Sequence, residues 1–145
     1  MCGIAGTYGR RDNGVVSSFL DAIRHRGPDE FPNVVSTDSV HLGAVRLSIV
    51  DVYHGSQPMV DSRTGNIVSM NGEIYNHAEL REELESLGCI FKTSCDTEVA
   101  LHGFTRIGPS FVRRMNGIFA ISFYRKSDRK LFLIRDYFGV KPLYY

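Results

Sequence analysis

The sequence lacks the features by which membrane-spanning, secreted and nucleic-acid-binding proteins are usually recognised. No apolar run approaches the roughly 20 residues that a membrane-spanning helix needs. The first ten residues, MCGIAGTYGR, contain no basic segment followed by an apolar one, so they do not resemble a signal peptide. The net charge is +1, which gives no electrostatic reason to expect binding to nucleic acid or to a membrane surface. We therefore predict a cytoplasmic protein with neither kind of partner.

Cysteine is also scarce, and its spacing argues against a metal site. The three cysteines, Cys2, Cys89 and Cys95, form an odd number and include no C-x-x-C pair of the kind that holds zinc. We expect no bound metal, and reduced thiols as in a cytosolic protein. The 145 residues, 43% of them hydrophobic and 23% charged, contain no internal repeat and fit one globular domain.

The periodicity of apolar residues predicts a domain of both helices and strands. Helices are predicted at 15–25, at about 77–87 and at 97–106, and strands at 3–8, 40–50, 66–70, 117–125 and 130–135. Asn76 and Glu79 resemble an N-cap residue and its reciprocal partner at the start of the second helix.

The strand at 130–135 has apolar residues on both faces, which indicates a sheet that is covered on both sides. The last residues, GVKPLYY, look like a strand cut short. We therefore expect that the 145 residues are part of a longer protein.

Cys2 is the first residue that can carry chemistry. Methionine before a small residue is commonly removed, which would leave Cys2 with a free α-amine. An α-amine titrates near pH ~7.7–8 and a free thiol near ~8.5, so the amine can act as the base for the thiol. No catalytic histidine is then needed. The alternative is a structural cysteine beside the initiator methionine, and position alone favours that alternative.

Arg46 is the second candidate. Strand alternation places it on the mostly apolar face of the segment 40–50, where a guanidinium needs an anion. Its planar fork suits a carboxylate, so it can bind a substrate carboxylate. An internal salt bridge, or a side chain that reaches from the strand end to water, is the other interpretation, and the sequence does not decide between them.

Asn71, Gly72, Glu73 and Asp96 are the next candidates. Asn71-Gly72 follows an apolar strand, which is typical of a plain hairpin turn. An asparagine amide and a glycine N–H at a strand end can instead form an oxyanion hole. Glu73 can accept from a substrate ammonium. Asp96 precedes a helix, so it can be an N-cap, a second acceptor for a substrate amine, or both.

Three other features of the sequence are weaker candidates for functional residues. The segment HRGPDE, 25–30, pairs a histidine with an arginine, but nothing in the sequence places it near Cys2, and a loop that ends a helix is the preferred interpretation. Cys89 lies beside an apolar Ile-Phe pair, which indicates packing. Cys95 precedes Asp96, and a neighbouring carboxylate disfavours a thiolate.

Seven motifs, in order and at fitting spacing, together resemble the glutaminase domain of class II glutamine amidotransferases, in the asparagine synthetase branch. Each motif is weak alone, but their order along nearly the whole chain makes the resemblance specific. They are MCGIAG at the terminus, RHRGPDE at 24–30, RLSIVD at 46–51, QPM at 57–59, NGEIYNH at 71–77, DTEV at 96–99 and RDYFGVKPLYY at 135–145.

The resemblance implies an α+β fold, the four-layer αββα sandwich of N-terminal-nucleophile hydrolases, with its C-terminal end truncated. It also implies roles. Cys2 would be the nucleophile, and Asn71 with Gly72 would form the oxyanion hole. The α-carboxylate of glutamine would be bound by Arg46, with the backbone of Leu47, Ser48, Ile49 and Val50 lining the pocket. Glu73 and Asp96 would accept from the α-ammonium group.

By the same resemblance, residues 1–145 would be an incomplete glutaminase domain that needs no cofactor. It would hydrolyse L-glutamine through a Cys2 thioester and supply ammonia to a synthetase domain that is absent from this chain. That domain would use ATP and Mg, most simply to make asparagine from aspartate or for a related amidation. A homodimer is possible. The alternatives are an idle or regulatory glutamine-binding module and an N-terminal-nucleophile hydrolase that acts on another amide.

Overall fold

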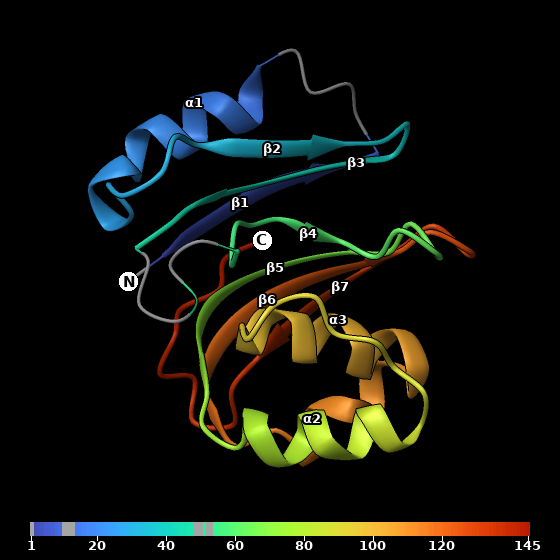
Figure 1. The fold of residues 1–145 in the computed structure, drawn as a ribbon. Helices are drawn as coiled ribbons and strands as arrows, with labels where there is room; N and C mark the ends of the chain where they lie inside the picture. The colour runs from blue at the N-terminus through green and yellow to red at the C-terminus, as the bar shows by residue number, and fades with distance from the viewer. Residues whose placement is uncertain (1, 10–13, 48–50, 52–53) are drawn as a thin grey trace.

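The computed structural model describes residues 2–9, 14–47, 51 and 54–145. They form four layers: a helix, a three-stranded sheet, a four-stranded sheet and a pair of helices (Figure 1). The elements are β1 (Gly3–Tyr8), α1 (Val15–Ala22), the 3-10 helix η1 (Arg24–Arg26), β2 (Asn33–Ser36), β3 (Val40–Val45), β4 (Met59–Val60), β5 (Ile67–Ile74), α2 (His77–Ser86), α3 (Asp96–Arg106), the 3-10 helix η2 (Pro109–Arg114), β6 (Gly117–Arg125) and β7 (Lys130–Arg135).

The first sheet has the antiparallel strand order β1-β3-β2, and α1 covers its outer face (Figure 1). Val16 and Leu20 of α1 are fully buried against Val45 of β3. Gly43 permits this close approach, because a Cβ atom at its position would lie 2.6 Å from Leu20 Cδ1.

The second sheet has the antiparallel order β4-β5-β6-β7, with α3 on its outer face and α2 packed against α3. This interface holds the largest core of the described chain, in which Met70 of β5 and Phe123 of β6 pack against Phe104 of α3. Most of α3 is buried, since it lies between the sheet and α2.

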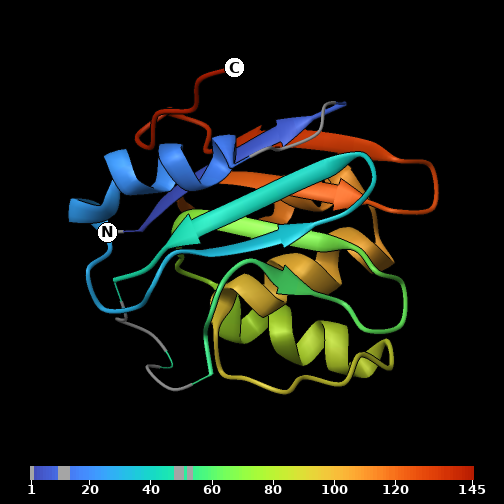
Figure 2. The same ribbon diagram turned by 90° about the horizontal axis from the view of Figure 1, so that it is seen from above.

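The two sheets lie one over the other, as the view from above shows (Figure 2). A smaller cluster of Val40, Leu42, Ile67 and Tyr124 fills the space between them. Strand alternation then fixes the directions along β5: Val68 and Met70 face the helices, so Asn71 and Glu73 share the face of Ile67 toward the first sheet.

The predicted αββα arrangement is confirmed, as are the strands at 3–8, 117–125 and 130–135. The short strands β2 and β4 were not predicted. The first helix is shorter than expected, because the chain tightens into η1 after Ala22. The expected strand at 139–145 does not form. The sheet is covered on both sides, but β7 is its edge strand, and Leu133 is 44% exposed.

Two predictions about local structure are wrong. Asn71-Gly72 is not a turn, because β5 continues through both residues to Ile74 and pairs with β6 throughout. Asn76 occupies the N-cap position of α2 without capping it. Its side chain instead donates to the carbonyl of Arg114 at 3.0 Å and accepts from the N–H of Asn116 at 2.9 Å.

Among the described residues, no helix is both long and apolar enough to cross a membrane.

Candidate active site

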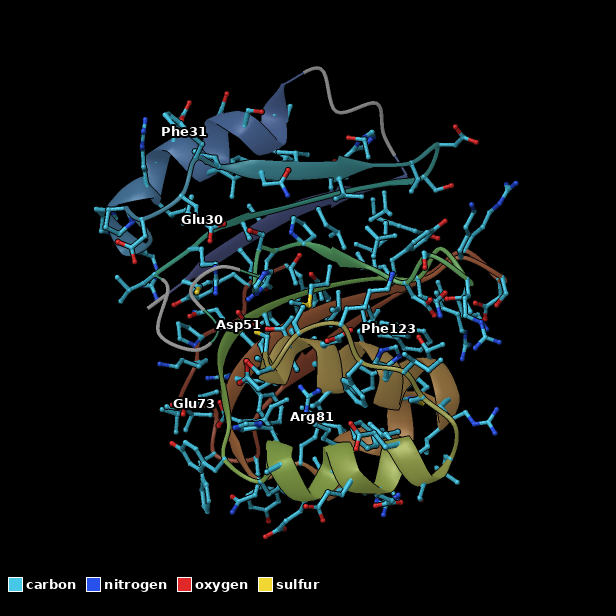
Figure 3. The ribbon with its side chains drawn as sticks, in the orientation of Figure 1. Glu30, Phe31, Asp51, Glu73, Arg81 and Phe123 are labelled. Atoms are coloured by element: carbon cyan, nitrogen blue, oxygen red, sulfur yellow. The ribbon has the colours of Figure 1, made fainter. Side chains whose placement is uncertain are left out.

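A cavity of about 210 Å³ opens between the two sheets, at the end of the molecule where the N-terminus lies. It is smaller than the roughly 300–1,000 Å³ of pockets for drug-sized ligands, which suits a molecule of amino-acid size. Glu30, Asp51 and Glu73 mark this end of the molecule in Figure 3. The lining residues are Cys2, Arg46, Leu47, Gln57, Gly72, Glu73, Cys95, Asp96, Thr97, Ile118 and Lys141.

Cys2 enters the cavity from the start of β1. Its side chain is partly exposed, and its Sγ lies 3.8 Å from the carbonyl oxygen of Leu47, as a weak donor. The Nε of Arg26 donates to the backbone carbonyl of Cys2 at 3.3 Å. The thiol is therefore held at the cavity wall, while its backbone is tied to η1.

Arg46 follows β3 and is 4% exposed. Its Nη1 forms an ion pair with Glu30, and its Nη2 donates to the carbonyl oxygen of Asp51 at 2.7 Å. The internal salt bridge that the sequence left open is thus present, and the side chain also lines the cavity. A guanidinium presents five N–H donors in a planar fork, the geometry that suits a carboxylate.

Gly72 of β5 lines the cavity, whereas the adjacent Asn71 is not among the lining residues. Asn71 is 6% exposed, and its Oδ1 has no hydrogen-bond partner among the described residues. Gly72 has a φ of 152°, and a Cβ atom there would overlap the backbone carbonyl of Ile118 on β6. The close pairing of β5 with β6 at this point therefore requires glycine.

Two carboxylates border the cavity, Asp96 at the start of α3 and Glu73 on β5. Asp96 is 4% exposed and accepts the N–H of Ile74 at 2.9 Å. It does not cap its own helix, so the N-cap interpretation is wrong. With Arg46 on the other sheet, the cavity carries both a cationic group and anionic groups, as the two charged ends of an amino acid require.

A second thiol, that of Cys95, also lines the cavity. Burial raises the pKa of Cys95 to about 11, and the neighbouring Asp96 adds to this effect. The expectation that Cys95 is not a thiolate is therefore confirmed, with burial as the larger cause. Cys89 packs against the main core, and burial raises its pKa as well.

The segment 25–30 lies at the site, contrary to the prediction that it only ends a helix. Arg26 and Glu30 contact Cys2 and Arg46 directly, and Pro28 forms a parallel bridge with Arg46. A Cβ at Gly27 would overlap the Arg46 backbone. These contacts join residues at least 16 positions apart, so local sequence patterns carry no sign of them.

Two further lining residues, Gln57 and Lys141, were not identified from the sequence as candidates. Gln57 is 6% exposed, donates to Thr97 Oγ1 at 3.2 Å and accepts the N–H of Met70 at 2.6 Å. It therefore ties β5 to α3 behind the cavity. Lys141 is buried, and its backbone N–H donates to Asp136 at 3.0 Å. Only their presence in the QPM and RDYFGVKPLYY motifs could have indicated them.

Leu47 lines the cavity, as expected, but Ser48, Ile49 and Val50 lie outside the described residues. In the part of the chain that is described, no group of three or more His, Cys, Asp or Glu residues is placed to hold a metal ion.

Comparison with known proteins gives a consistent result. The family model of the glutamine amidotransferase domain matches residues 1–145. The glutamine-hydrolysing asparagine synthetase 1 of Bacillus subtilis is 38% identical over 152 residues, which cover 100% of this chain and 24% of that protein. Asparagine synthetase B of Escherichia coli is 37% identical over 150 residues, 99% of this chain and 26% of that protein. The chain thus spans about a quarter of the length of these relatives.

Two solved structures share the fold. The glutamine phosphoribosylpyrophosphate amidotransferase of B. subtilis superposes with a TM-score of 0.79 at 19% identity, over 98% of this chain and 38% of that one. A structure described as the allosteric regulatory enzyme of purine biosynthesis gives 0.81 at 21% identity, with the same coverage. These likenesses establish the N-terminal-nucleophile hydrolase fold.

Proposed function

Because the chain belongs to the glutamine amidotransferase domain family, a family of enzymes, we propose that it hydrolyses the side-chain amide of L-glutamine to glutamate and ammonia. One observation carries the proposal: one small cavity is lined by the Cys2 thiol, by Gly72 of β5 next to the buried Asn71, and by charged groups of both signs. A hydrolase that acts on the side-chain amide of an amino acid needs these groups together.

The proposed reaction begins after removal of Met1. The α-amine of Cys2 takes the thiol proton, and the thiolate attacks the amide carbon of glutamine. The C–N bond of the tetrahedral intermediate breaks, and the amine returns the proton to the leaving ammonia. Water, activated by the same amine, then attacks the γ-glutamyl thioester, which releases glutamate and restores the thiol.

The remaining groups would bind the substrate and stabilise the tetrahedral intermediates. The Nδ2 group of Asn71 and the N–H of Gly72 would donate to the oxyanion of each tetrahedral intermediate. Arg46 would bind the α-carboxylate of glutamine, with the backbone of Leu47, Ser48, Ile49 and Val50 beside it. Asp96 and Glu73 would accept from the α-ammonium group. The charge of each group is opposite to that of the substrate group it would meet.

For the whole protein we propose transfer of the ammonia to an ATP- and Mg-dependent synthetase domain. The names of the relatives support asparagine synthesis as the acceptor reaction. We propose aspartate as the acceptor. The glutaminase reaction itself needs no cofactor, because thiol, amine and water supply every step. We also propose a cytoplasmic location, because the three free cysteines suit a reducing compartment.

The test is Cys2→Ala in the full-length protein, with glutamine and ammonia compared as nitrogen sources. Glutamate release should fall to background, while ammonia-dependent synthesis should continue. Cys89→Ala, which removes a thiol outside the cavity, is the matched control and should keep both activities.

Undiminished glutamate release by Cys2→Ala would refute the proposal. Retention of Met1, measured by intact mass spectrometry of the active protein, would contradict the role of the α-amine. Glutamine binding by the wild type without any turnover would favour the idle binding module instead.

A further inference from the structure

Asp51 lies behind the cavity wall, outside the residues that line it, yet it contacts both halves of the site. We propose that Asp51 is a positioning residue that holds Arg46 and Asp96 at the spacing required by the α-carboxylate and α-ammonium groups of the substrate. The inference rests on the proposed function and adds to it a residue that sets selectivity for an L-α-amino acid.

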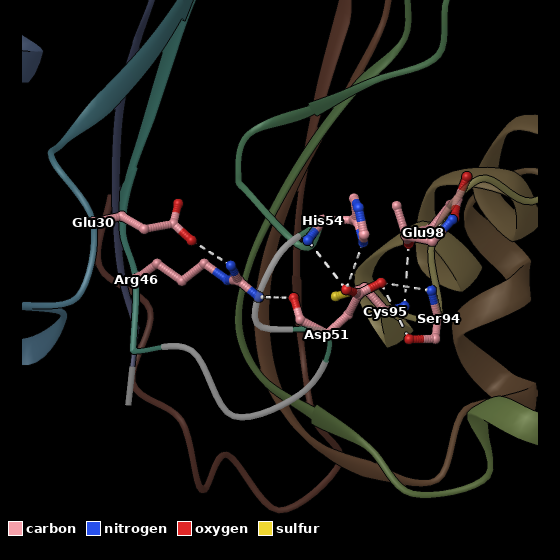
Figure 4. Close-up of polar contacts among 8 residues, drawn as sticks. Glu30, Arg46, Asp51, His54, Ser94, Cys95 and Glu98 are labelled. Atoms are coloured by element: carbon pink, nitrogen blue, oxygen red, sulfur yellow. Dashed lines mark hydrogen bonds and ion pairs between the residues drawn. The ribbon is translucent and has the colours of Figure 1, made fainter.

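The Asp51 carboxylate connects the loop after β3 to the segment that precedes α3 (Figure 4). Its Oδ2 accepts from the backbone N–H of Ser94 at 2.8 Å and from the Ser94 hydroxyl at 3.1 Å. Its Oδ1 accepts from the backbone N–H of His54 at 3.1 Å. The side chain is only 9% exposed, so water competes weakly for these bonds.

The backbone of Asp51 holds Arg46. Its carbonyl oxygen accepts from Arg46 Nη2 at 2.7 Å and from the N–H of Gly55 at 3.0 Å. Asp51 has a φ of 48°, in the left-handed region that aspartate adopts more readily than most residues. This conformation presents the carbonyl to the guanidinium, on the side opposite the Glu30 contact (Figure 4).

The segment that carries Ser94 is also held in place. Glu98 of α3 accepts from the N–H groups of Lys92 and Thr93, at 2.9 and 2.7 Å. The Thr93 hydroxyl in turn accepts from the N–H of Cys95 at 3.1 Å. Ser94 therefore lies in a segment that is rigidly attached to α3, two residues before Asp96. A hydrogen bond to Ser94 therefore fixes its partner relative to the first residues of α3.

The negative charge of the Asp51 carboxylate strengthens its hydrogen bonds from Ser94 and His54. The hydrogen bond from the Ser94 N–H is the largest cause of a lowered pKa of Asp51, and the bonds from His54 add to it. The carboxylate is thus ionised at neutral pH, and hydrogen bonds to a charged acceptor are stronger than those to a neutral one. Without them, the Asp51 carbonyl that contacts Arg46 would lose its connection to the start of α3, and the substrate would have to fix the spacing of Arg46 and Asp96, which weakens binding.

The experiment compares Asp51→Asn with Asp61→Asn in the full-length protein. Asparagine keeps the size of the side chain but turns one acceptor oxygen into a donor, which faces either Ser94 or His54. Asp61 is a matched control, because it accepts from the N–H of Arg63 at 2.9 Å and from the Thr64 hydroxyl at 2.7 Å in a turn away from the cavity.

For Asp51→Asn, the KM for L-glutamine should rise about tenfold, the effect of losing one or two charge-assisted hydrogen bonds. The kcat should change by less than about threefold, since the reacting groups are untouched. The preference for L- over D-glutamine should fall, because stereoselectivity depends on the relative placement of Arg46 and Asp96. Asp61→Asn should change none of these. An unchanged KM and stereoselectivity in Asp51→Asn, with an active wild type, would overturn the inference.

Hydrogen exchange gives a readout that does not depend on turnover. The Ser94 amide should exchange faster in Asp51→Asn than in the wild type, and at the wild-type rate in Asp61→Asn. Equal Ser94 exchange in all three proteins would overturn the inference even if the KM changed. An inactive wild type with faster Ser94 exchange in Asp51→Asn would instead refute the proposed function, so the two failures are distinguishable.

Discussion

At the scale of one residue, Asn71 differs from an asparagine of the core in its hydrogen bonding. Buried polar atoms in native proteins are almost always hydrogen-bonded, and an exception needs an explanation. The Oδ1 of Asn71 has no partner among the described residues, although the side chain is 6% exposed. Asn66, just before β5, is equally buried but donates to Thr105 and accepts from Lys126. The two asparagines therefore differ: the amide oxygen of Asn71, an acceptor, has no partner in the described part of the chain, whereas the side chain of Asn66 is held by structural hydrogen bonds.

We predict opposite effects for the two alanine substitutions. Asn71→Ala should lower kcat for glutamine hydrolysis by about 100- to 1,000-fold, the effect of losing one oxyanion donor, with little change in stability. Asn66→Ala should cost about 1–3 kcal/mol of stability, because it leaves buried partners unsatisfied, and should hardly change kcat. Steady-state kinetics and urea denaturation measure the two quantities. A large stability loss in Asn71→Ala with unchanged kcat would show that its role is structural.

The residue type alone made Arg46 and Asp96 recognisable as candidates. A guanidinium on an apolar strand face and a carboxylate at a helix start each need a partner, and both residues are buried at the cavity. Their actual partners could not be inferred, because Glu30 and Ile74 reach them only through the packing of distant segments. For the same reason the sequence could not place Arg26 beside Cys2.

At the scale of the element, β5 depends on a glycine that its sequence made look like a turn. Asn-Gly is a strong hairpin signal because both residues tolerate positive φ. Here the positive φ of Gly72 is used inside a paired strand, where β6 approaches so closely that no side chain fits. The pairing partner lies more than 40 residues away, so the local pattern could not distinguish the two uses.

Gly72→Ala should therefore abolish glutaminase activity and cost more than about 3 kcal/mol, because strain in φ and overlap with β6 add together. Gly88→Ala is the control, since Gly88 also has a positive φ, of 85°, but no atom lies within 4 Å of the added Cβ. We expect it to cost only about 1–2 kcal/mol and to leave kcat unchanged. Urea denaturation followed by activity would test both, and equal losses for the two variants would contradict the argument.

Helix α3 and the segment before it depend on the ionised form of Glu98. Burial alone would raise the pKa of Glu98, but the His102 ring at 3.5 Å and the hydrogen bonds from Thr93 and the Lys92 N–H lower it to about 2. The side chain is 8% exposed, so solvent screens these bonds little. A carboxyl whose pKa is lower in the folded state stabilises the fold above its unfolded pKa, near 4.5, and loses that contribution as the pH falls toward 2.

We predict that the free energy of unfolding falls by on the order of 3 kcal/mol between pH 5 and pH 2 through this group alone. Glu98→Gln should be less stable than the wild type at pH 7 and should show a flatter dependence on pH over the same window. Urea denaturation at a series of pH values provides the measurement. Parallel stability curves for the two proteins would mean that Glu98 makes no such contribution.

At the scale of the whole molecule, the order of the layers could be inferred from the sequence. The segments that meet to form the cavity could not. Periodicity predicted most long elements, since amphipathic helices and alternating strands reflect which faces are buried. The strands β2 and β4, of four and two residues, are too short to show a period. The cavity draws on β1, β5, β6, α3 and the chain after β3, and no local pattern states which segments meet. Only the order of the seven motifs, through resemblance, indicated that they do.

The contact between the two sheets decides whether those segments stay together. The described inter-sheet cluster is small compared with the core under α3, and Leu42 is one of its fully buried members. Leu42→Ala should cost about 2–5 kcal/mol, the usual range for a buried leucine, and should lower the urea concentration at which half the glutaminase activity is lost. Leu87→Ala is a matched control, because Leu87, after α2, is 43% exposed.

We expect Leu87→Ala to change the urea midpoint by less than about a quarter of the change in Leu42→Ala, since it removes little buried area. In the absence of urea both variants should keep nearly the wild-type KM, because neither residue lines the cavity. An equal shift for the two leucines would show that the inter-sheet cluster does not hold the site together. A shift confined to Leu42→Ala would show that Cys2 and Arg46 on one sheet are kept opposite Gly72 and Asp96 by packing between the layers.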